Sequence, residues 1–410
     1  MQCSLTVRAK CWGAIVMPEI IIAGAGLGSL TPEVREAVSR AEVVCCSSRF
    51  LKLIPDGKRV IDLKNFAQAF SGIAQESGQV VILVSGDPGL YSLLPLVKRR
   101  FPRENITVLP GISSLQTLCA RACESWSDAV ILSGHGRSLR AGKFLNLVER
   151  NRLVVLFCDK NNSPQWACRK LLPLSGVDVV IGENLGSDSE RVLFGRPDDF
   201  VNHESPELSL MLIRNNSPFV PENFHPRDSE FLRAPGIVMT NESVRSVILA
   251  RLSLRKDSIL WDIGAGTGSI SVSAGLEFPE CEIHAVEHKK EAAALIAHNA
   301  ENFHLHNIEI HNGRALEVIA GLPEPSHVFI GGSDGELAGI IEHVRFIHNR
   351  VRVVAACVTL ETFSKACELL RDFANFEAVQ ILAASSKPLT PDATMMKANN
   401  PVMLLSCDTQ

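Results

Sequence analysis

The sequence contains no apolar run that approaches the ~20 residues needed for a membrane-spanning helix. It also lacks a basic excess, because 41 Lys and Arg residues stand against 45 Asp and Glu residues, giving a formal net charge of -4 at pH 7. A general nucleic-acid-binding protein usually carries a basic excess. We therefore expect neither a membrane nor a nucleic acid among the partners of this chain.

Cysteine pairs with metal-binding spacing are absent as well. The 12 cysteines form no Cys-x-x-Cys pair, and most lie in apolar runs, as Cys45 and Cys46 do. Buried, reduced thiols of a cytoplasmic protein account for this usage. The 12 histidines include His304, His306 and His311, for which we see no thiolate or carboxylate partner at metal spacing. We expect these histidines to be surface or core residues, and we expect no metal.

The N-terminus does not have the pattern of a signal peptide, because Arg8 and Lys10 interrupt the segment that would have to be apolar. Met17 directly precedes Pro18–Ile22, the first strand-like segment. Residues 1–16 are therefore expected to be a disordered extension, unless the chain starts at Met17.

The whole chain has the composition of a globular protein with room for two or three domains: 410 residues, 46% hydrophobic and 21% charged. Short β-branched runs alternate with amphipathic segments up to about Arg214, and a second such series follows a helix expected at 241–252. Between the two series, Pro218, Pro221, Pro226 and Pro235 interrupt any regular element. We expect one α/β domain at 17–214, a linker at 215–235 and a second α/β domain at 236–410.

The periodicity also predicts individual elements. In the first domain we expect strands at 19–23, 42–45, 79–84, 105–109, 128–132, 152–157, 177–181 and 208–213, and helices at 32–40, 66–76, 90–101, 114–122, 142–149 and 164–172. In the second we expect strands at 258–263, 282–287, 307–312, 327–330, 350–357, 376–382 and 402–406, with helices between the first six. The segment 384–401 reads as a loop without a helix. A parallel return needs a longer crossover, usually helical, so the last strand is expected to be antiparallel.

The segment Asp262–Gly268 carries the clearest chemical signal. An apolar strand runs into Asp262, and Gly264, Gly266 and Gly268 then alternate with Ala265 and Thr267 before a helix-like segment. Glycines at such a turn let a ligand approach the backbone at a helix N-terminus. Glu287 closes the next strand, where an acid can hold ribose hydroxyls. Because the spacing is Gly-x-Gly-x-Gly rather than that of a pyrophosphate loop, we expect an adenosine cofactor without a diphosphate, of which S-adenosylmethionine is the commonest.

The first domain has glycine turns after three of its expected strands. They are Gly24–Ser29, which contains Gly26 and Gly28, then Ser85–Tyr91 and Pro110–Ser114. Open α/β sheets bind ligands at the C-terminal ends of their strands. We therefore expect the three turns to converge on one cleft.

These three turns, together with Ser133–Arg137 and Gly182–Gly186, resemble the tetrapyrrole methylase family over about residues 19–213, and in particular its branch acting on precorrin-6Y. In that family the first loop usually reads Gly-x-Gly-Pro-Gly, whereas this chain has Leu27 at the proline position. The resemblance implies a pair of α/β subdomains and S-adenosylmethionine as cofactor. It also implies that Asp87, Pro88, Ser113 and Ser114 belong to the cofactor cleft.

From about Ala234 to the end, the chain resembles the small methyltransferase that partners this branch. The matching segments are Met239–Glu242, Asp262–Gly268, Asn312–Ala315, Phe329–Ser333 and Val358–Thr362. The resemblance implies a Rossmann-like methyltransferase domain of seven strands, the last antiparallel. The fused pair looks like the decarboxylating precorrin-6Y methyltransferases of cobalamin biosynthesis. It implies methylation of ring carbon 5 by the first domain and of carbon 15 by the second, with loss of the ring-C acetate carboxylate to give precorrin-8X.

The same resemblance implies further site residues, each with a plainer alternative. Thr240 and Ala315 would contact the cofactor, although Thr240 would also serve as a helix cap, and Glu287 would also be an ordinary solvated acid. Gly331, Gly332 and Ser333 would face the substrate, or form only a tight turn. Asp87 and Glu361 are weak catalytic candidates, the latter also explained as a helix first-turn charge.

Basic side chains are candidates for binding substrate carboxylates. Arg137, Arg140 and Lys143 would do so in the first domain, or form a solvated basic loop. Lys387 would do so in the second, within a loop expected to cover the tetrapyrrole, where this chain has Thr390–Ala393 in place of the family's paired glycines. The relatives commonly self-associate, so a homo-oligomer is expected.

Two other functions stay open at this point. One is an NAD-dependent oxidoreductase built on the loop at Gly264, against which the glycine spacing argues. The other is that one half has lost activity and serves as a docking module, as Leu27 and the changed segment at Thr390 would allow.

Overall fold

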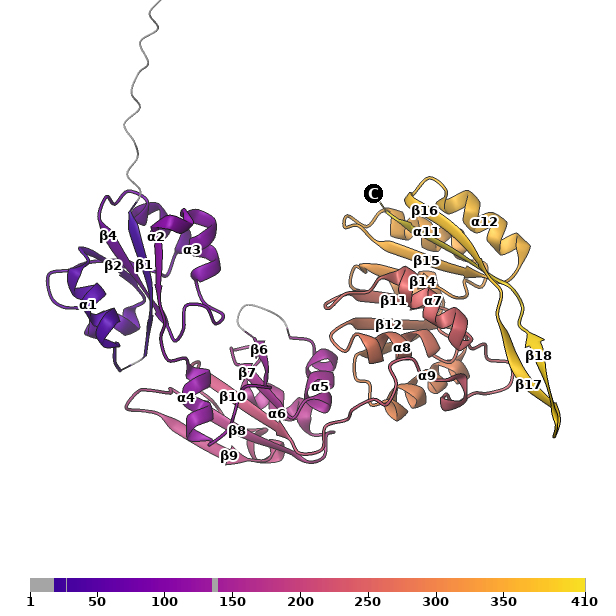
Figure 1. Ribbon diagram of the computed structural model, residues 1–410, viewed down its shortest axis with the longest axis horizontal. Helices are drawn as coiled ribbons and strands as arrows, with labels where there is room; N and C mark the ends of the chain where they lie inside the picture. Colours follow the sequence, from indigo (N-terminus) through magenta and orange to yellow (C-terminus); the bar gives the residue numbers. More distant parts are fainter. Residues whose placement is uncertain (1–17, 27, 135–138, 410) are drawn as a thin grey trace, which may run out of the picture. The chain divides into compact units, whose positions relative to one another are not determined.

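The computed structural model describes residues 18–26, 28–134 and 139–409 (Figure 1). The expectations for residues 1–16, Met17, Leu27 and Arg137 lie outside this range. By their contacts, the residues form two compact units. One comprises 1–137, 155–168 and 178–213, and the other comprises 138–154, 169–177 and 214–410.

The first sheet has five parallel strands in the order β3-β2-β4-β1-β5. Apolar clusters on both of its faces bury alternate side chains of the same strands, such as Ile20 and Ile22 on one face and Ile21 and Ala23 on the other. Thr31 starts the first helix by accepting a hydrogen bond from Val34 N, with Pro32 at the first helical position. The elements are β1 (Glu19–Ala25), α1 (Pro32–Arg40), β2 (Val43–Cys46), the 3₁₀ turn η1 (Ser48–Leu53), β3 (Arg59–Asp62), α2 (Phe66–Ile73), β4 (Gln79–Ser85), α3 (Leu94–Arg100), η2 (Arg103–Asn105), β5 (Ile106–Leu109) and α4 (Ser114–Arg121).

The second sheet also has five strands, in the order β6-β7-β10-β8-β9, with β8 and β9 antiparallel. Its interior strand β7 is a continuous apolar run whose first four residues are buried, as expected for a strand covered on both faces. The elements are β6 (Val130–Ser133), α5 (Ala141–Arg150), β7 (Leu153–Phe157), α6 (Pro164–Leu171), β8 (Val177–Glu183), β9 (Arg191–Gly195), η3 (Pro197–Phe200) and β10 (Ser209–Asn215). The sequence predicted both sheets as alternating α/β, but it missed the short strands β3 and β9.

The third sheet has seven strands in the order β13-β12-β11-β14-β15-β19-β16, and β19 runs antiparallel to both of its neighbours, whereas the other pairs are parallel. This confirms the predicted seven strands with an antiparallel last strand. One apolar cluster packs α7 and α8 on one face, and another packs α10, α11 and α12 on the other. The elements are η4 (Asp228–Glu230), α7 (Glu242–Leu252), β11 (Ile259–Ile263), α8 (Ser269–Glu277), β12 (Glu282–Glu287), α9 (Lys290–Asn302), β13 (Ile308–Asn312), α10 (Ala315–Ile319), β14 (His327–Ile330), α11 (Leu337–Arg345), β15 (Arg352–Cys357), α12 (Leu360–Leu370), β16 (Ala374–Ile381) and β19 (Val402–Asp408).

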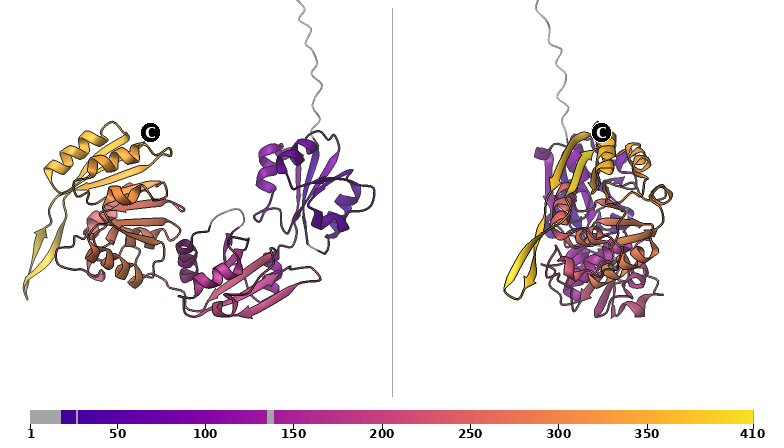
Figure 2. Two further views of the ribbon diagram at one scale, coloured as in Figure 1. Left: turned by 180° about the vertical axis from the view of Figure 1, so that it is seen from behind. Right: turned by 90° about the vertical axis from the view of Figure 1, so that its right-hand side faces the viewer.

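Between β16 and β19 the chain forms an antiparallel hairpin, β17 (Ala384–Thr390) and β18 (Ala393–Ala398). All residues of both strands are exposed, and the hairpin extends outward from the seven-stranded sheet (Figures 1 and 2). The prediction of a loop without regular structure was therefore wrong. Because neither strand buries a face, this segment contains polar residues and Pro388 and lacks the apolar alternation that predicts a strand.

The segment predicted as a linker packs against the last domain. Arg245 of α7 is almost completely buried, and its guanidinium donates to the Asp228 carboxylate at 3.1 Å and to the Pro226 carbonyl. Phe231 packs against Phe303 with ring centroids 5.2 Å apart. No helix in the described part of the chain is long and apolar enough to cross a membrane.

Candidate functional site

The glycine loop after β11 lies where the strand order of the seven-stranded sheet reverses, between β11 and β14. Such a switch point leaves a crevice at the C-terminal ends of the strands. Gly264 has φ +72°, and a Cβ there would lie 2.3 Å from the carbonyl oxygen of Gly332, in the turn after β14. Gly331 N donates to Ile263 O at 2.9 Å. The predicted cofactor loop and the predicted substrate turn Gly331–Ser333 are therefore in backbone contact.

A second backbone segment supports the loop from the N-terminal side of α7. Val238 O accepts a hydrogen bond from Thr267 N at 3.3 Å, and a Cβ on Gly266 would lie 2.4 Å from the same oxygen. Thr240 follows two residues later, and its carbonyl accepts from Arg245. The cap of α7 is Asn241, whose side chain accepts from Ser243 N. The alternative of Thr240 as the helix cap was therefore wrong.

Asp262 is buried beneath the N-terminus of α8. Its Oδ2 accepts hydrogen bonds from the backbone N–H of Ser271 at 3.1 Å and from the hydroxyl of Ser271 at 2.5 Å. Burial raises the pKa of the Asp262 carboxyl from 3.8 to about 6, and the Ser271 hydrogen bonds oppose that rise. Its Oδ1 is buried without a hydrogen-bond partner among the described residues. Asp262 therefore anchors the helix that follows the loop and leaves one oxygen directed away from that contact.

Glu287 ends β12 with its side chain 7% exposed. One carboxylate oxygen accepts from Gly266 N at 2.9 Å, and the other accepts from Lys289 N at 2.9 Å. The alternative of an ordinary solvated acid is thus wrong, because Glu287 is buried against the glycine loop. Each oxygen has a further lone pair, and a carboxylate at this position can accept from a pair of ribose hydroxyls.

A cleft opens beside the loop and takes in the turns after β13 and β14. Its lining is Ile263, Gly264, Val286, His288, Gly313, Arg314, Ala315, Gly332, Ser333, Asp334 and Glu336. Arg314 lies at the rim, where its Nε donates to Glu336 at 2.7 Å. That hydrogen bond raises the pKa of Arg314 and lowers the pKa of Glu336. Of the predicted residues, Gly264, Ala315, Gly332 and Ser333 line this cleft directly.

The geometry fits an adenosine cofactor. Close backbone approach at Gly264 and Gly266 leaves no room for side chains. Val286 and His288, the neighbours of Glu287 in the chain, line the cleft, and the Glu287 carboxylate accepts from Gly266 N of the loop. Asp262 Oδ1 is buried without a hydrogen-bond partner among the described residues. Sequence reasoning missed two supports of this loop, the Val238 carbonyl and Asn299, whose amide donates to Thr267 O at 2.9 Å, and it did not single out Arg314 at the rim of the cleft. The position of Arg314 just after the C-terminal end of β13 could have indicated it from the sequence. The Val238 contact is made by backbone atoms, so no side chain in the sequence indicates it.

The three glycine turns of the first sheet do converge. A Cβ on Gly24 would lie 2.2 Å from Gly86 O and 2.6 Å from Gly111 N, so the turns after β1, β4 and β5 touch. A Cβ on Gly28 would lie 3.0 Å from Gly186 O, which brings the segment after β8 to the same loop. At Gly26 the nearest such contact is 3.5 Å away. The converging turns form a second candidate site.

The polar candidates of this second site have local partners. Asp87 accepts from Gly89 N at 2.7 Å, and the neighbouring Pro88 is buried. Ser113 is the N-cap of α4 in a capping box with Gln116, and Ser114 is the first helical residue. Sequence reasoning missed the structural role of Tyr91, the single tyrosine of the chain, whose hydroxyl donates to Ile131 O at 2.7 Å.

The remaining candidates are dispersed. Arg140 pairs with Glu282, and Lys143 pairs with Asp257 and, at 3.1 Å, with Glu280. Lys387 is exposed on the hairpin strand β17, and Glu361 is exposed in the first turn of α12. The expectation that the histidines lack carboxylate partners was wrong: His304 lies 2.9 Å from Glu149, and His311 lies 3.8 Å from Glu309.

Two families match the chain in tandem: residues 19–200 match the tetrapyrrole (corrin/porphyrin) methylases, and residues 234–408 match the precorrin methyltransferase domain. A precorrin-6Y C(5,15)-methyltransferase [decarboxylating] from Sinorhizobium sp is 28% identical over 370 residues, covering 85% of this chain and 86% of the relative. A probable cobalt-precorrin-6B C(15)-methyltransferase (decarboxylating) from Pyrobaculum calidifontis is 38% identical over 182 residues, covering 44% of this chain and 93% of the relative. Among solved structures, a precorrin-6Y C5,15-methyltransferase from Geobacter metallireducens has 34% sequence identity and a TM-score of 0.42, covering 45% of this chain and 96% of that one.

Proposed function

The chain belongs to the decarboxylating precorrin methyltransferases, and from that premise we propose that it methylates precorrin-6Y twice and removes one carboxylate. The domain at 17–214 acts on ring carbon 5. The domain at 236–410 acts on ring carbon 15 and decarboxylates the ring-C acetate, and the product is precorrin-8X. The tandem match to two methylase families, each on a part with its own glycine-lined site, is the observation that carries this proposal.

We propose S-adenosylmethionine as the cofactor of both sites. When bound, it supplies a methyl group already activated on a sulfonium. Gly264–Gly268 would lie against it, with Thr240 and Ala315 on either side, and Glu287 would accept from the ribose hydroxyls. In the first domain, the backbone at Gly24, Gly26, Gly28 and Ser114 would form the cradle, beside Asp87, Pro88 and Ser113.

The chain's residues act mainly by alignment. The meso carbons of the ring are themselves nucleophiles, so holding carbon and methyl in line in a site that excludes water supplies most of the catalysis. In the decarboxylation the C–C bond breaks, carbon dioxide leaves and the electron pair enters a conjugated imine of the substrate. We propose that Arg314, at the cleft rim, and Gly331–Ser333 position the ring for this step. Lys387, Arg137 and Arg140 would bind outer carboxylates, and Asp87 and Glu361 stay weaker catalytic candidates.

We further propose a cytoplasmic homo-oligomer. Ten cysteines in the described part of the chain are free thiols, which suits a reducing compartment. Leu389, Met395 and Met396 are exposed on the hairpin, where a second copy of the chain would cover them. Light scattering of the full chain, compared with the triple variant L389S/M395S/M396S, would test this; a wild-type monomer contradicts it.

The proposed function is tested by incubating the full chain with precorrin-6Y and S-adenosylmethionine and measuring the mass of the product by mass spectrometry. We expect two added methyl groups and one lost carbon dioxide. The variant E287Q, assayed with limiting S-adenosylmethionine, should show reduced methylation at carbon 15 and unchanged methylation at carbon 5. A product with one methyl group from the wild-type chain would show that one half is not a methyltransferase, and calorimetric binding of NAD would reopen the oxidoreductase alternative.

A further inference from the structure

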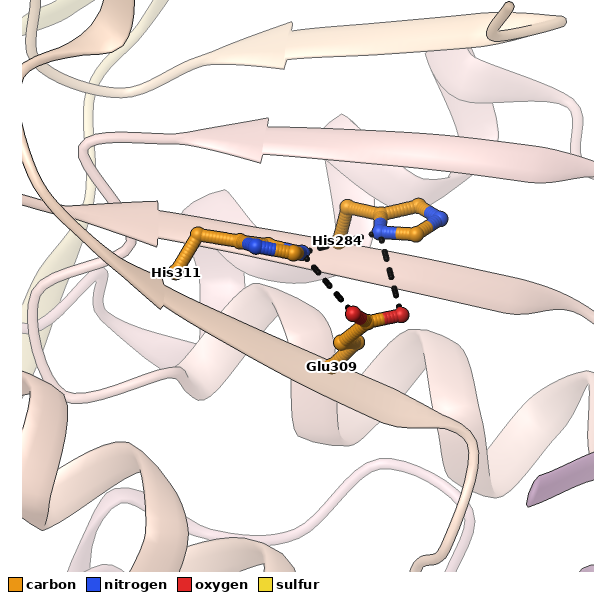
Figure 3. A group of neighbouring side chains, drawn as sticks. All are labelled: His284, Glu309 and His311. Atoms are coloured by element: carbon orange, nitrogen blue, oxygen red, sulfur yellow. Dashed lines mark hydrogen bonds and ion pairs between the residues drawn. The ribbon is translucent and has the colours of Figure 1, made fainter. Parts of the chain in front are cut away.

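Three potential metal ligands gather on one face of the seven-stranded sheet, on the neighbouring strands β12 and β13. In the parallel register His284 pairs with Glu309, and Val286 pairs with His311, so His284, Glu309 and His311 all point to the same side (Figure 3). His284 Nδ1 lies 3.0 Å from His311 Nε2 and 3.7 Å from Glu309 Oε2, and His311 Nε2 lies 3.8 Å from Glu309 Oε1. None of these residues belongs to either methylation site.

A fourth residue, Glu282, fixes the orientation of the buried histidine. Its Oε1 lies 2.8 Å from His284 Nε2. A carboxylate there accepts the Nε2 proton, so the neutral ring presents the lone pair of Nδ1 to the cluster. A carboxylate that orients a histidine through its distant nitrogen is the usual support of a metal-bound histidine.

We propose that His284, Glu309 and His311 bind a divalent transition-metal ion such as Zn²⁺ or Co²⁺. Two nitrogens and one carboxylate oxygen are a donor set suited to these ions. Ligand atoms about 2.0–2.2 Å from a tetrahedral ion lie about 3.3–3.6 Å from one another. The three separations here lie within a few tenths of an ångström of that range. The two histidine nitrogens approach different oxygens of Glu309, so this exposed carboxylate would rotate to present one oxygen to the ion. Glu309 is 66% exposed, so a fourth position is open to solvent.

The groups around the cluster carry a net negative charge, which favours a cation. Glu309 and Glu282 bring two negative charges, and Arg140, which pairs with Glu282, brings one positive charge, so the net charge is −1 before a dication binds. The alternative occupant is a proton shared between the two histidines across the 3.0 Å contact. A metal ion would displace that proton, so the two readings differ in whether the chain takes up metal.

The experiment is a titration of the chelator-treated full chain with Co²⁺, followed by visible absorption, and with Zn²⁺, followed by calorimetry. We expect one equivalent to bind at this cluster with the absorption of tetrahedral or five-coordinate Co²⁺. H311Q and E309Q should each weaken this binding at least about tenfold, and E282Q, which alters the partner of His284 Nε2, about 10–100-fold. H298Q is the matched control, because His298 is an exposed histidine of α9 in the same domain.

The outcome does not depend on methylation, since the readout is metal binding. Glu309 is the most exposed of the three ligands, so E309Q keeps the test valid if H311Q does not fold. The proposal is overturned if the wild-type chain takes up neither ion. It is also overturned if E309Q binds as tightly as the wild-type chain and H298Q, and the cluster is then a hydrogen-bonded histidine pair.

Discussion

The carboxylate of Glu287 accepts a hydrogen bond from the backbone N–H of Gly266 at 2.9 Å. This bond joins the end of β12 to the glycine loop that follows β11. It means that the residue proposed to hold the ribose also sets the shape of the loop proposed to hold the rest of the cofactor. A substitution of Glu287 therefore acts on binding in two ways, and the choice of replacement separates them.

Glu287→Gln keeps the size of the side chain and one acceptor oxygen, but it removes the charge. Hydrogen bonds to charged groups contribute about 1.5–3 kcal/mol, so we expect S-adenosylmethionine affinity at the second site to fall about tenfold or more. Glu287→Ala also leaves Gly266 N and Lys289 N without their partner and should weaken binding further. Calorimetric titration measures both. Glu361→Gln is the control, because Glu361 is an exposed acid of the same domain. Unchanged S-adenosylmethionine affinity in Glu287→Gln would contradict the proposed role of Glu287 in binding the ribose.

Gly264→Ala should destabilise the second domain. The backbone there is left-handed, at φ +72°, and the new Cβ would lie 2.3 Å from Gly332 O. The left-handed conformation alone costs about 1–2 kcal/mol for a residue with a Cβ, and the contact adds about 1–3 kcal/mol of overpacking. Gly236→Ala isolates the first cost, because Gly236 has φ +77° and no atom within 4 Å of a Cβ. Equal losses of unfolding free energy in denaturant would show that the close approach to Gly332 is unimportant.

Buried strands are what the sequence predicted best. The ranges of β12 and β14 match those expected from the sequence, since both strands lie inside the sheet and every residue after the first is buried. The strands that were missed have little to bury. β3 is a short edge strand, and β17 and β18 are fully exposed. Their pairing is held by backbone hydrogen bonds, which leave no hydrophobic pattern in the sequence.

The same distinction applies to the candidate site. Glycine spacing and the position of Glu287 predicted the loop and its acid, because these depend on chain geometry close to a single strand end. The contact of Val238 O with Thr267 N joins segments 29 residues apart through backbone atoms, and no side chain marks it. The His284, Glu309 and His311 cluster was missed for a related reason. Its members meet only through the register between β12 and β13.

Asp262→Asn should change how stability depends on pH. Burial raises the pKa of Asp262 from 3.8 to about 6 in the folded chain. The folded state therefore binds this proton more tightly than the unfolded state does. The protonated Asp262 carboxyl makes its full contribution to the free energy of unfolding below about pH 3.8, and this contribution is lost as pH rises through about 6. We expect the wild-type chain to match Asp262→Asn near pH 4 and to be less stable by up to about 3 kcal/mol at pH 7. Denaturant unfolding without cofactor measures this, and a difference that does not vary with pH would contradict it.

Gly24→Ala should remove one of two cofactor sites. A Cβ at Gly24 would lie 2.2 Å from Gly86 O and 2.6 Å from Gly111 N, so the turns after β1, β4 and β5 must separate to admit it. Gly78→Ala is the matched control, because Gly78 lies outside the proposed site and a Cβ there would meet nothing closer than Glu42 Oε2 at 3.7 Å. Because the second site lies in the other compact unit, we expect the full chain to bind two equivalents of S-adenosylmethionine as wild type or Gly78→Ala, and one as Gly24→Ala. Combining Gly24→Ala with Glu287→Ala should then abolish detectable binding. Two equivalents retained by Gly24→Ala would mean that the converging glycine turns are a packing feature, and the proposal of a cofactor cleft in the first domain would fail.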